Sequence, residues 1–304
     1  MSGYISEFYG FPIDGVTGGL QENAQKGICP ITNSPCAKKL SRDNMPSGVC
    51  AIKQVKSDSP DIICCPIRLY AEDYKLLRLI AKNAFKEDFP LLAGKNAIEY
   101  ALEKKKDAIA VFGHDWGGEL RLPKREGVGS YFVDWVLAKI NENGQLIEFT
   151  AIEVQTIDTT GSYRKAREAL LQGYLNVKDT VGLNWENVSK RIIPQIIYKG
   201  QVLQREELCR TGLYFVCPMP VYNNVLKRLG GKEKLMKFPP QPASIHFLAY
   251  DYDLSVTKEA EKMRPLTIVE EHCTTVYKVQ EAFSAVDLPD GNVYRDAILR
   301  ALYD

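Results

Sequence analysis

The sequence predicts an α/β protein, with a mixed β-sheet flanked by helices and a small cysteine-rich module ahead of it. Two observations lead to this fold class. Five of the eight cysteines lie in the first 65 residues, within segments too polar to form a hydrophobic core. From residue 71 onward, stretches with apolar residues at helical spacing are interspersed with short apolar runs bounded by turn residues. This combination is typical of a sheet covered by helices.

The bulk composition is that of an ordinary soluble globular protein. Of the 304 residues, 45% are hydrophobic and 25% are charged, and the formal net charge is +1. No run of about 20 apolar residues indicates a membrane span. The first residues, MSGYISEFYGFPIDG, lack the basic-then-apolar pattern of a signal peptide. We therefore expect a cytoplasmic protein without membrane contacts. The near-neutral charge does not indicate a polyanion partner, although a local basic face would suffice for nucleic acid.

The clustered cysteines indicate either a metal site or reduced free thiols, because disulfides are rare in the cytoplasm. With one of the adjacent Cys64 and Cys65 counted, the spacing is Cys29-x6-Cys36-x13-Cys50-x14-Cys65. Four thiolates bind zinc or iron tetrahedrally and would order a segment that buries little apolar surface. We expect residues 1–70 to form a four-cysteine metal-binding module and residues 71–304 to form the second domain. The spacing does not select between Cys64 and Cys65.

The elements after residue 70 follow in order. Apolar residues at helical spacing predict helices over residues 71–85 and 96–106. Apolar or β-branched runs then predict strands over 108–112, 117–122, 131–140 and 145–156, and Asn143-Gly144 predicts a hairpin turn between the last two.

The second half of the chain continues the alternation. A helix is expected over residues 162–175, with Ser162 as its N-cap. A helical stretch within 184–204 and a buried strand over 213–218 follow. Residues 272–283 and the terminal helix over 292–304 are amphipathic, and we assign no chemistry to them.

Acidic residues meet on the predicted hairpin. Glu153 and Gln155 point to one face of their strand, because side chains alternate, and Asp134 on the neighbouring strand can reach the same face. Glu119, after Gly117-Gly118, is a third acid within reach. Converging carboxylates repel one another unless a cation lies between them, and hard oxygen ligands suit Mg²⁺. Taken alone, the pattern is also compatible with an ordinary solvated strand face.

An Asp on one strand followed by (Glu/Asp)-x-Lys on the next is the core of PD-(D/E)xK nucleases, and here Gln155 stands where the Lys is usual. Several segments are more specific and resemble the NotI family of restriction endonucleases. The resemblance extends from near residue 4 to about residue 220. The matching segments are YISEFYG (4–10), GICP (27–30), SGVC (47–50), CPIR (65–68), GGEL (117–120), VDW (133–135), EVQTIDTTGSYRKA (153–166) and NVSKRIIPQIIYK (187–199).

The resemblance implies a PD-(D/E)xK core with an N-terminal four-cysteine module that holds iron, with zinc as the alternative. It implies a type II restriction endonuclease, acting as a homodimer, that cleaves double-stranded DNA at a specific, GC-rich palindrome and leaves 5′-phosphate ends with Mg²⁺ as cofactor. A cognate DNA methyltransferase, encoded separately, is the implied partner. The segment from about residue 222 is expected to add DNA-recognition or dimer contacts.

The resemblance also assigns residues. The iron ligands of the family are matched by Cys29, Cys36, Cys50 and Cys65. The CPxR motif, here CPIR, selects Cys65 over Cys64. Asp134, Glu153 and Gln155 match the catalytic triplet, and Glu119 matches an acid upstream of it. We expect Asp134 and Glu153 to bind Mg²⁺, Glu119 to bind a second ion or orient a water, and Gln155 to hydrogen-bond the attacking water or a phosphate oxygen.

Arg164 and Lys165 begin the predicted helix that follows the strand of Glu153 and Gln155. In the nuclease core that the resemblance implies, the start of this helix lies near the scissile phosphate. We expect them to contact DNA phosphates, and a solvated first helical turn is the alternative. Two other functions stay open at this point. One is a DNA-binding protein with the nuclease fold but no cleavage, and the other is a non-specific DNA nuclease, which the near-zero net charge disfavours.

Overall fold

The computed structural model describes residues 3–14, 18–40, 44–55, 60–114, 116–120, 132–157, 159–160, 163–175, 177–179, 181–256, 263–285 and 290–303. Its central feature is a seven-stranded sheet in the order β15-β14-β13-β10-β9-β8-β7. β8, β9 and β10 pair antiparallel, whereas β10, β13 and β14 run parallel to one another, so the sheet is mixed. The strands are β7 (Leu91–Ala93), β8 (Ala108–Gly113), β9 (Trp135–Ile140), β10 (Leu146–Val154), β13 (Leu213–Pro218), β14 (Ser244–Tyr252) and β15 (Leu266–Thr275).

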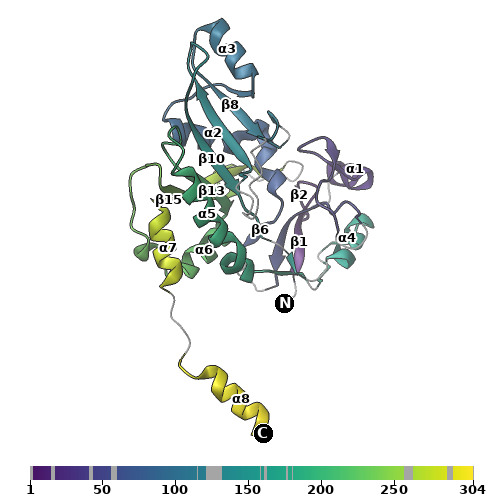
Figure 1. Ribbon diagram of the computed structural model, residues 1–304. Helices are drawn as coiled ribbons and strands as arrows, with labels where there is room; N and C mark the ends of the chain where they lie inside the picture. Colours follow the sequence, from purple (N-terminus) through teal and green to yellow (C-terminus); the bar gives the residue numbers. More distant parts are fainter. Residues whose placement is uncertain are drawn as a thin grey trace.

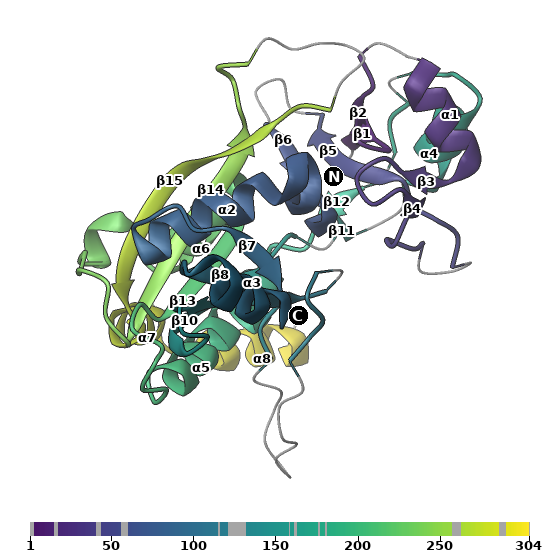
Figure 2. The ribbon, with the colours of Figure 1, turned by 90° about the horizontal axis from the view of Figure 1, so that it is seen from above.

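Helices cover both faces of this sheet, as predicted (Figures 1 and 2). Ile152 and the other residues on one face pack against α2, whereas the alternate residues, such as Ala151, face the core formed with α5, α6 and α7. Small side chains of α3 pack on the latter face at the far end of the sheet. The helices are α2 (Ala71–Phe85), α3 (Asn96–Lys104), α5 (Ile193–Leu203), α6 (Met219–Arg228) and α7 (Val276–Ser284), with a π-helical turn η2 (Val188–Ile192) before α5 and a 3₁₀ turn η3 (Lys232–Lys234) after α6.

The N-terminal part forms a second, four-stranded sheet in the order β2-β1-β5-β6. The strands are short, and their buried residues join one continuous core with the helices below the main sheet. The elements are β1 (Gly3–Phe8), β2 (Phe11–Pro12), α1 (Gly18–Lys26), β3 (Ile28–Cys29), β4 (Ser34–Pro35), β5 (Val49–Gln54), β6 (Asp61–Ile63) and the 3₁₀ turn η1 (Pro66–Tyr70).

A buried ion-pair network ties the N-terminal sheet to the segment before β15. Glu7 on β1 and Arg68 on η1 have fully buried side chains, with Arg68 Nε 3.1 Å from Glu7 Oε2. Arg264 approaches the same carboxylate at 3.5 Å and pairs with Asp61 at 2.6 Å. Its guanidinium lies 3.6 Å from the centroid of the Tyr252 ring. A buried carboxylate is stable only when it is paired, so this network fixes how the two sheets meet.

Helix α4 (Arg164–Leu171) packs against the N-terminal sheet and not against the main one (Figures 1 and 2). Arg167 is buried and its Nε donates to the carbonyl oxygens of Pro46 and Ser47 at 3.1 and 3.2 Å. The Tyr163 hydroxyl lies 3.0 Å from the Ser47 hydroxyl. The small strands β11 (Thr159–Thr160) and β12 (Gly182–Leu183) flank this helix in sequence. Contacts of the first 70 residues therefore extend to a segment that lies 120 and 121 residues after the residues it contacts.

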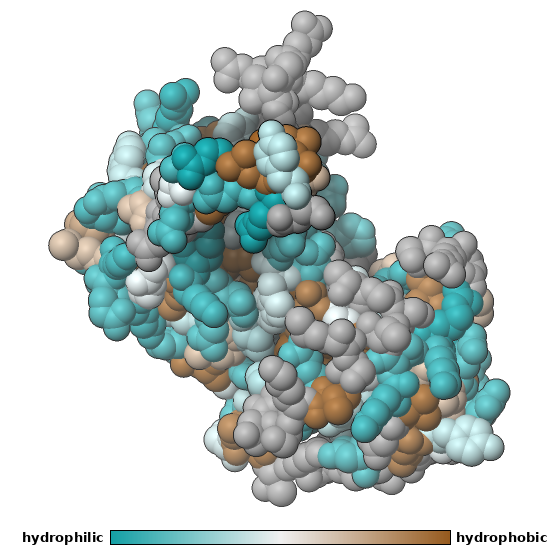
Figure 3. Space-filling view, turned by 90° about the horizontal axis from the view of Figure 1, so that it is seen from below, coloured by the Kyte–Doolittle hydropathy of each residue, from teal (hydrophilic) through white to brown (hydrophobic). Residues whose placement is uncertain are grey.

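The last helix, α8 (Val293–Tyr303), has no buried residue and projects from the rest of the molecule (Figure 1). Its exposed side chains are both apolar, as Ile298 and Leu302 are, and charged. Figure 3 views the molecule from the side on which α8 projects and shows brown apolar atoms among teal polar ones there. Among the described residues, no helix combines the length and the apolar character that crossing a bilayer would require.

Most predicted elements are confirmed, and two details are wrong. The strand expected over 117–122 is absent from residues 118–120; only isolated bridges join Trp116 and Gly117 to Gly113, and residues 121–122 lie outside the described part. The strand expected from residue 131 begins at Trp135, so Asp134 precedes it. Ser162, the expected N-cap, also lies outside the described residues. The hairpin turn at Asn143-Gly144 is confirmed, with Gly144 donating to the Asn141 carbonyl oxygen.

Candidate active site

The β9–β10 hairpin brings Asp134 and Glu153 together. Trp135 pairs with Ile152 in the antiparallel register, so Asp134 lies beside Glu153 and Val154 at the end of the hairpin. The backbone N–H of Val154 donates to Asp134 Oδ2 at 2.7 Å and holds this carboxylate against the neighbouring strand. Glu153 is 8% exposed, whereas Asp134 reaches solvent. The sequence-based expectation that the two acids share one face of the hairpin agrees with this arrangement.

The pKa values of both carboxyls are raised, as expected of acids that lie close together. Burial and, after it, the charge of Asp134 raise the pKa of Glu153 to about 7, against the opposing charge of Lys199. The pKa of Asp134 is also raised, chiefly because surrounding protein atoms remove part of its hydration, although its side chain reaches the surface. Two neighbouring acids with raised pKa values are characteristic of functional sites that bind a cation or move a proton.

Asp134, Glu119 and Gln155 line a cavity of about 900 Å³ above β8, β9 and β10. Glu119 is exposed, and its charge contributes to the raised pKa of Asp134. Gly117 makes the turn before it possible: its φ is +81°, and a Cβ there would lie 1.8 Å from the Val111 carbonyl oxygen. Three of the four acidic or amide residues expected at the site therefore line one cavity, and Glu153 is the neighbour in sequence of Val154, which also lines it.

Gln155 is turned partly toward its own backbone. Its Nε2 donates to the Thr156 carbonyl oxygen at 2.7 Å, and its backbone N–H donates to the Val216 carbonyl oxygen at 2.9 Å. One amide hydrogen and the amide oxygen are left to face the cavity. A neutral amide in this position can hydrogen-bond a water or a phosphate oxygen, but it supplies no positive charge.

Lys199 was not singled out from the sequence, and in the part of the chain that the structure describes it is the cation paired with Glu153. Its Nζ lies 2.5 Å from Glu153 Oε1, and the two side chains are 11% and 10% exposed. A signal was present in the sequence. Ile193, Ile196 and Leu203 mark the buried stripe of α5, and Lys199 lies on the same stripe. A lysine at a core position of a helix indicates a buried partner of opposite charge.

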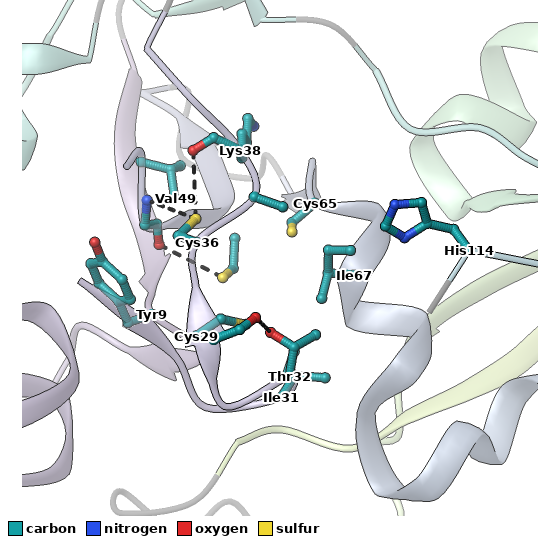
Figure 4. Close-up of a pocket in the computed structure, with 14 residues that line it drawn as sticks. Tyr9, Cys29, Ile31, Thr32, Cys36, Lys38, Val49, Cys65, Ile67 and His114 are labelled. Carbon is teal, nitrogen blue, oxygen red and sulfur yellow. Dashed lines mark hydrogen bonds between the residues drawn. The ribbon is translucent and has the colours of Figure 1, made fainter. Parts of the chain in front are cut away.

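The four cysteines expected to bind metal line a second cavity, of about 190 Å³ (Figure 4). Cys29 lies on β3, Cys36 follows β4, Cys50 lies on β5 and Cys65 precedes η1. Backbone N–H groups point at two of the sulfurs: Gly10 N lies 3.3 Å from Cys50 Sγ, and Gly48 N lies 3.4 Å from Cys36 Sγ. A hydrogen bond from Cys50 lowers the pKa of Cys65 to about 7, which favours its thiolate.

The adjacent cysteines differ in position. Cys65 lines the cavity, whereas Cys64 is buried elsewhere, with Lys38 Nζ 3.2 Å from its sulfur. Within the described ranges, no three His, Cys, Asp or Glu side chains are arranged closely enough to hold an ion as they stand. Figure 4 shows Ile67 and His114 at the cysteine cavity. Both residues also line the acidic cavity, so the two cavities adjoin.

Arg164 and Lys165 lie apart from the acids. They begin α4, whose buried side packs on the N-terminal sheet, and neither residue lines the cavity that contains Asp134. Lys165 is exposed and Arg164 is half-buried. The expected location of this helix beside the scissile phosphate is thus not apparent in the single chain, and a phosphate contact by these residues stays a prediction.

Comparison with known proteins accords with the geometry. No curated protein sequence matches the chain. A family model described as restriction endonuclease NotI matches residues 18–209. This range contains the four cysteines, both acids of the hairpin and Lys199, and it covers more than half of the chain. We conclude that the chain belongs to the NotI restriction endonuclease family and is a type II site-specific deoxyribonuclease.

Proposed function

We propose that the chain cleaves double-stranded DNA by Mg²⁺-dependent phosphodiester hydrolysis at the Asp134–Glu153 pair, on a PD-(D/E)xK core. The observation that carries this proposal is the pairing of two carboxyls at the end of one hairpin, where the pKa of each is raised and the charge of Asp134 contributes to the raised pKa of Glu153. Such a pair is stable in its ionised form only when a cation neutralises it. Asp134 lines a cavity of about 900 Å³ through which the pair can be approached from solvent.

The donors fit Mg²⁺. Glu153 Oε2 is buried and has no hydrogen-bond partner among the described residues, so one carboxylate oxygen is available as a ligand. With Asp134 it supplies hard oxygen ligands in the small number that Mg²⁺ prefers when water and phosphate complete the shell. The ion, when bound, would polarise a phosphoryl oxygen and lower the pKa of a bound water. We propose that Glu119 binds a second ion or orients a water at the same cavity.

Cleavage would proceed by in-line attack of water on phosphorus. The new P–O bond forms as the bond from phosphorus to the 3′ oxygen breaks, which leaves a 5′-phosphate and a 3′-hydroxyl. The proton lost by the attacking water passes to solvent, and the 3′ oxygen takes a proton from another water. Gln155 would hydrogen-bond the attacking water or a non-bridging phosphate oxygen through the amide hydrogen left free by its bond to Thr156.

We propose a structural iron or zinc ion for the cysteine cavity, with Cys29, Cys36, Cys50 and Cys65 as ligands. The chemistry of the donors supports this, because four thiols line one small cavity and backbone N–H groups point at two of the sulfurs. Thiolates bind both metals, and N–H···S hydrogen bonds stabilise a bound thiolate. The ion would order the N-terminal module, which adjoins the acidic cavity through Ile67 and His114.

We propose that the enzyme acts in the cytoplasm as a homodimer on a GC-rich palindrome, with a separately encoded methyltransferase protecting the same site. A palindrome matches the two-fold symmetry of a dimer, and family resemblance supports the rest. Arg164 and Lys165 would contact phosphates outside the cleavage site, because α4 lies on the N-terminal module. The segment after residue 222 would add DNA or dimer contacts.

The proposal is tested by incubating the purified protein with Mg²⁺ and plasmid or genomic DNA and sequencing the fragment ends, with an EDTA-treated sample as control. We expect discrete fragments whose ends share one sequence and carry 5′-phosphates. A smear without a shared end would indicate a non-specific nuclease. Intact DNA that is nevertheless retarded in a gel would indicate binding without cleavage, and either result would contradict the proposal.

A further inference from the structure

The position of Lys199 on α5 is unusual for a lysine. It belongs to the buried stripe of this helix, together with Ile193, Ile196, Gly200 and Leu203. Gly200 allows the helix to approach the sheet, because a Cβ at this position would lie 2.7 Å from Ile245 Cδ1. An ammonium held this deeply is costly to bury unless a carboxylate pairs with it. Helix α5 therefore packs close enough to the sheet to place a positive charge beside β10.

The ammonium is paired with Glu153 and is close enough to Asp134 for its charge to act there. It lies 2.5 Å from Glu153 Oε1, and its charge lowers the pKa of Asp134 as well as that of Glu153. Gln155, two residues after Glu153, supplies no charge and uses one amide hydrogen for the Thr156 carbonyl oxygen. Among the described side chains that line the acidic cavity, none is a lysine or an arginine. Of the described residues, the cation paired with Glu153 is therefore Lys199 on the helix and not a residue of the strand.

We propose that Lys199 is a catalytic residue of the cleavage reaction, whose ammonium supplies the positive charge that Gln155 lacks. This inference rests on the proposed cleavage at Asp134 and Glu153. With the carboxylates turned to a bound ion, Nζ donates a hydrogen bond to the attacking water or to a non-bridging oxygen of the scissile phosphate. It stays protonated throughout, so the water's proton leaves to solvent and the 3′ oxygen is protonated by water. The fixed charge stabilises the negative charge that accumulates on the phosphate in the transition state.

A purely structural role makes a different prediction for the same lysine. If Lys199 serves only to neutralise buried Glu153, a divalent cation can replace it, and its removal would leave the cleavage rate unchanged at saturating Mg²⁺. Removal of the ammonium also removes a charge that repels the cation, so binding of the ion should be unchanged or tighter. Loss of rate together with retained ion binding would therefore separate the chemical role from the structural one.

The test compares Lys199→Met with Lys278→Met in the full-length protein. Methionine keeps the length of the side chain and suits an apolar stripe, and Lys278 is paired with Glu281 on the adjacent helix α7, away from the acids. Single-turnover cleavage is measured at saturating Mg²⁺ on plasmid DNA that the wild-type protein cuts. Ca²⁺ affinity is measured by calorimetry, and Ca²⁺-supported DNA binding is measured by gel retardation.

We expect Lys199→Met to cleave about 100-fold more slowly, with Ca²⁺ and DNA affinities within about threefold of wild type or tighter, and Lys278→Met to behave as wild type. Lys199→Arg should recover part of the rate, because it restores the charge. A Lys199→Met rate within a few-fold of wild type would overturn the inference, as would a slow variant that has also lost Ca²⁺ binding. If the wild-type protein itself cuts no DNA, the proposed function fails and not merely the role of Lys199.

Discussion

The affinity of the acidic site for a divalent cation is expected to increase with pH, because the cation must displace a proton from Glu153. With a pKa of about 7, this carboxyl is ionised in roughly one tenth of molecules at pH 6 and nine tenths at pH 8. The apparent affinity should therefore be about tenfold weaker at pH 6 than at pH 8, and it should level off above pH 8. The pKa of Asp134 is raised too, which acts in the same direction.

The raised pKa of Glu153 also predicts how the stability of the metal-free protein depends on pH. The folded state binds the Glu153 proton more tightly than the unfolded chain, whose carboxyl titrates near 4.5. The stabilisation from this group is therefore complete below about pH 4.5 and is lost as the pH rises through about 7. Relative to Glu153→Gln, the metal-free wild type should lose thermal stability over that interval, and a divalent cation should restore more of it at pH 8 than at pH 6.

Calorimetric titration with Ca²⁺ at pH 6, 7 and 8 checks the prediction. Ca²⁺ is a hard cation that prefers oxygen ligands, so it does not compete for the thiolates. Glu153→Gln serves as the control, since it keeps the shape of the side chain and removes its titration. A wild-type affinity that stays within twofold from pH 6 to pH 8 would refute the reasoning from the raised pKa.

Three further predictions concern other parts of the molecule. Arg68→Met should lower the free energy of unfolding in urea by about 3–5 kcal/mol, because it leaves a fully buried carboxylate without its main partner; a loss below about 1 kcal/mol would count against the buried network. Cys65→Ser should abolish the metal found by elemental analysis of the purified protein, whereas Cys64→Ser should retain it, and the opposite pattern would reverse the ligand assignment. Replacing Arg164 and Lys165 by alanine should reduce the slope of log affinity for DNA against log salt by about 1 to 2 without a change in the sequence cut, and an unchanged slope would exclude phosphate contacts.

Local patterns in the sequence were sufficient for most of the fold. Apolar runs predict strands because a buried strand needs apolar side chains along its length, and the Asn-Gly turn fixes the hairpin that pairs Asp134 with Glu153. The strand expected over 117–122 was wrong because Gly117 and Gly118 both adopt positive φ, which turns the chain. A strand pattern alone does not reveal that local conformation.

Tertiary placement was less accessible from the sequence. Lys199 reaches Glu153 across 46 residues of chain, and only its location on an apolar helical stripe hinted at a buried partner. Helix α4 begins ten residues after β10, which carries Glu153, and was therefore expected beside the acids. Instead, Arg167 attaches the helix to Ser47 in the N-terminal part of the chain. Contacts between segments so far apart depend on packing of the whole chain, which periodicity and spacing do not encode.

The central claim is that the acids of the β9–β10 hairpin carry out DNA cleavage. The most direct measurement incubates wild type, Asp134→Ala and Glu153→Ala with Mg²⁺ and the same DNA, at concentrations where gel retardation in Ca²⁺ shows DNA bound by all three. We expect the wild type to cut, and both variants to bind DNA but leave it intact, because each has lost a ligand of the ion. Full cleavage by either variant would contradict the assignment.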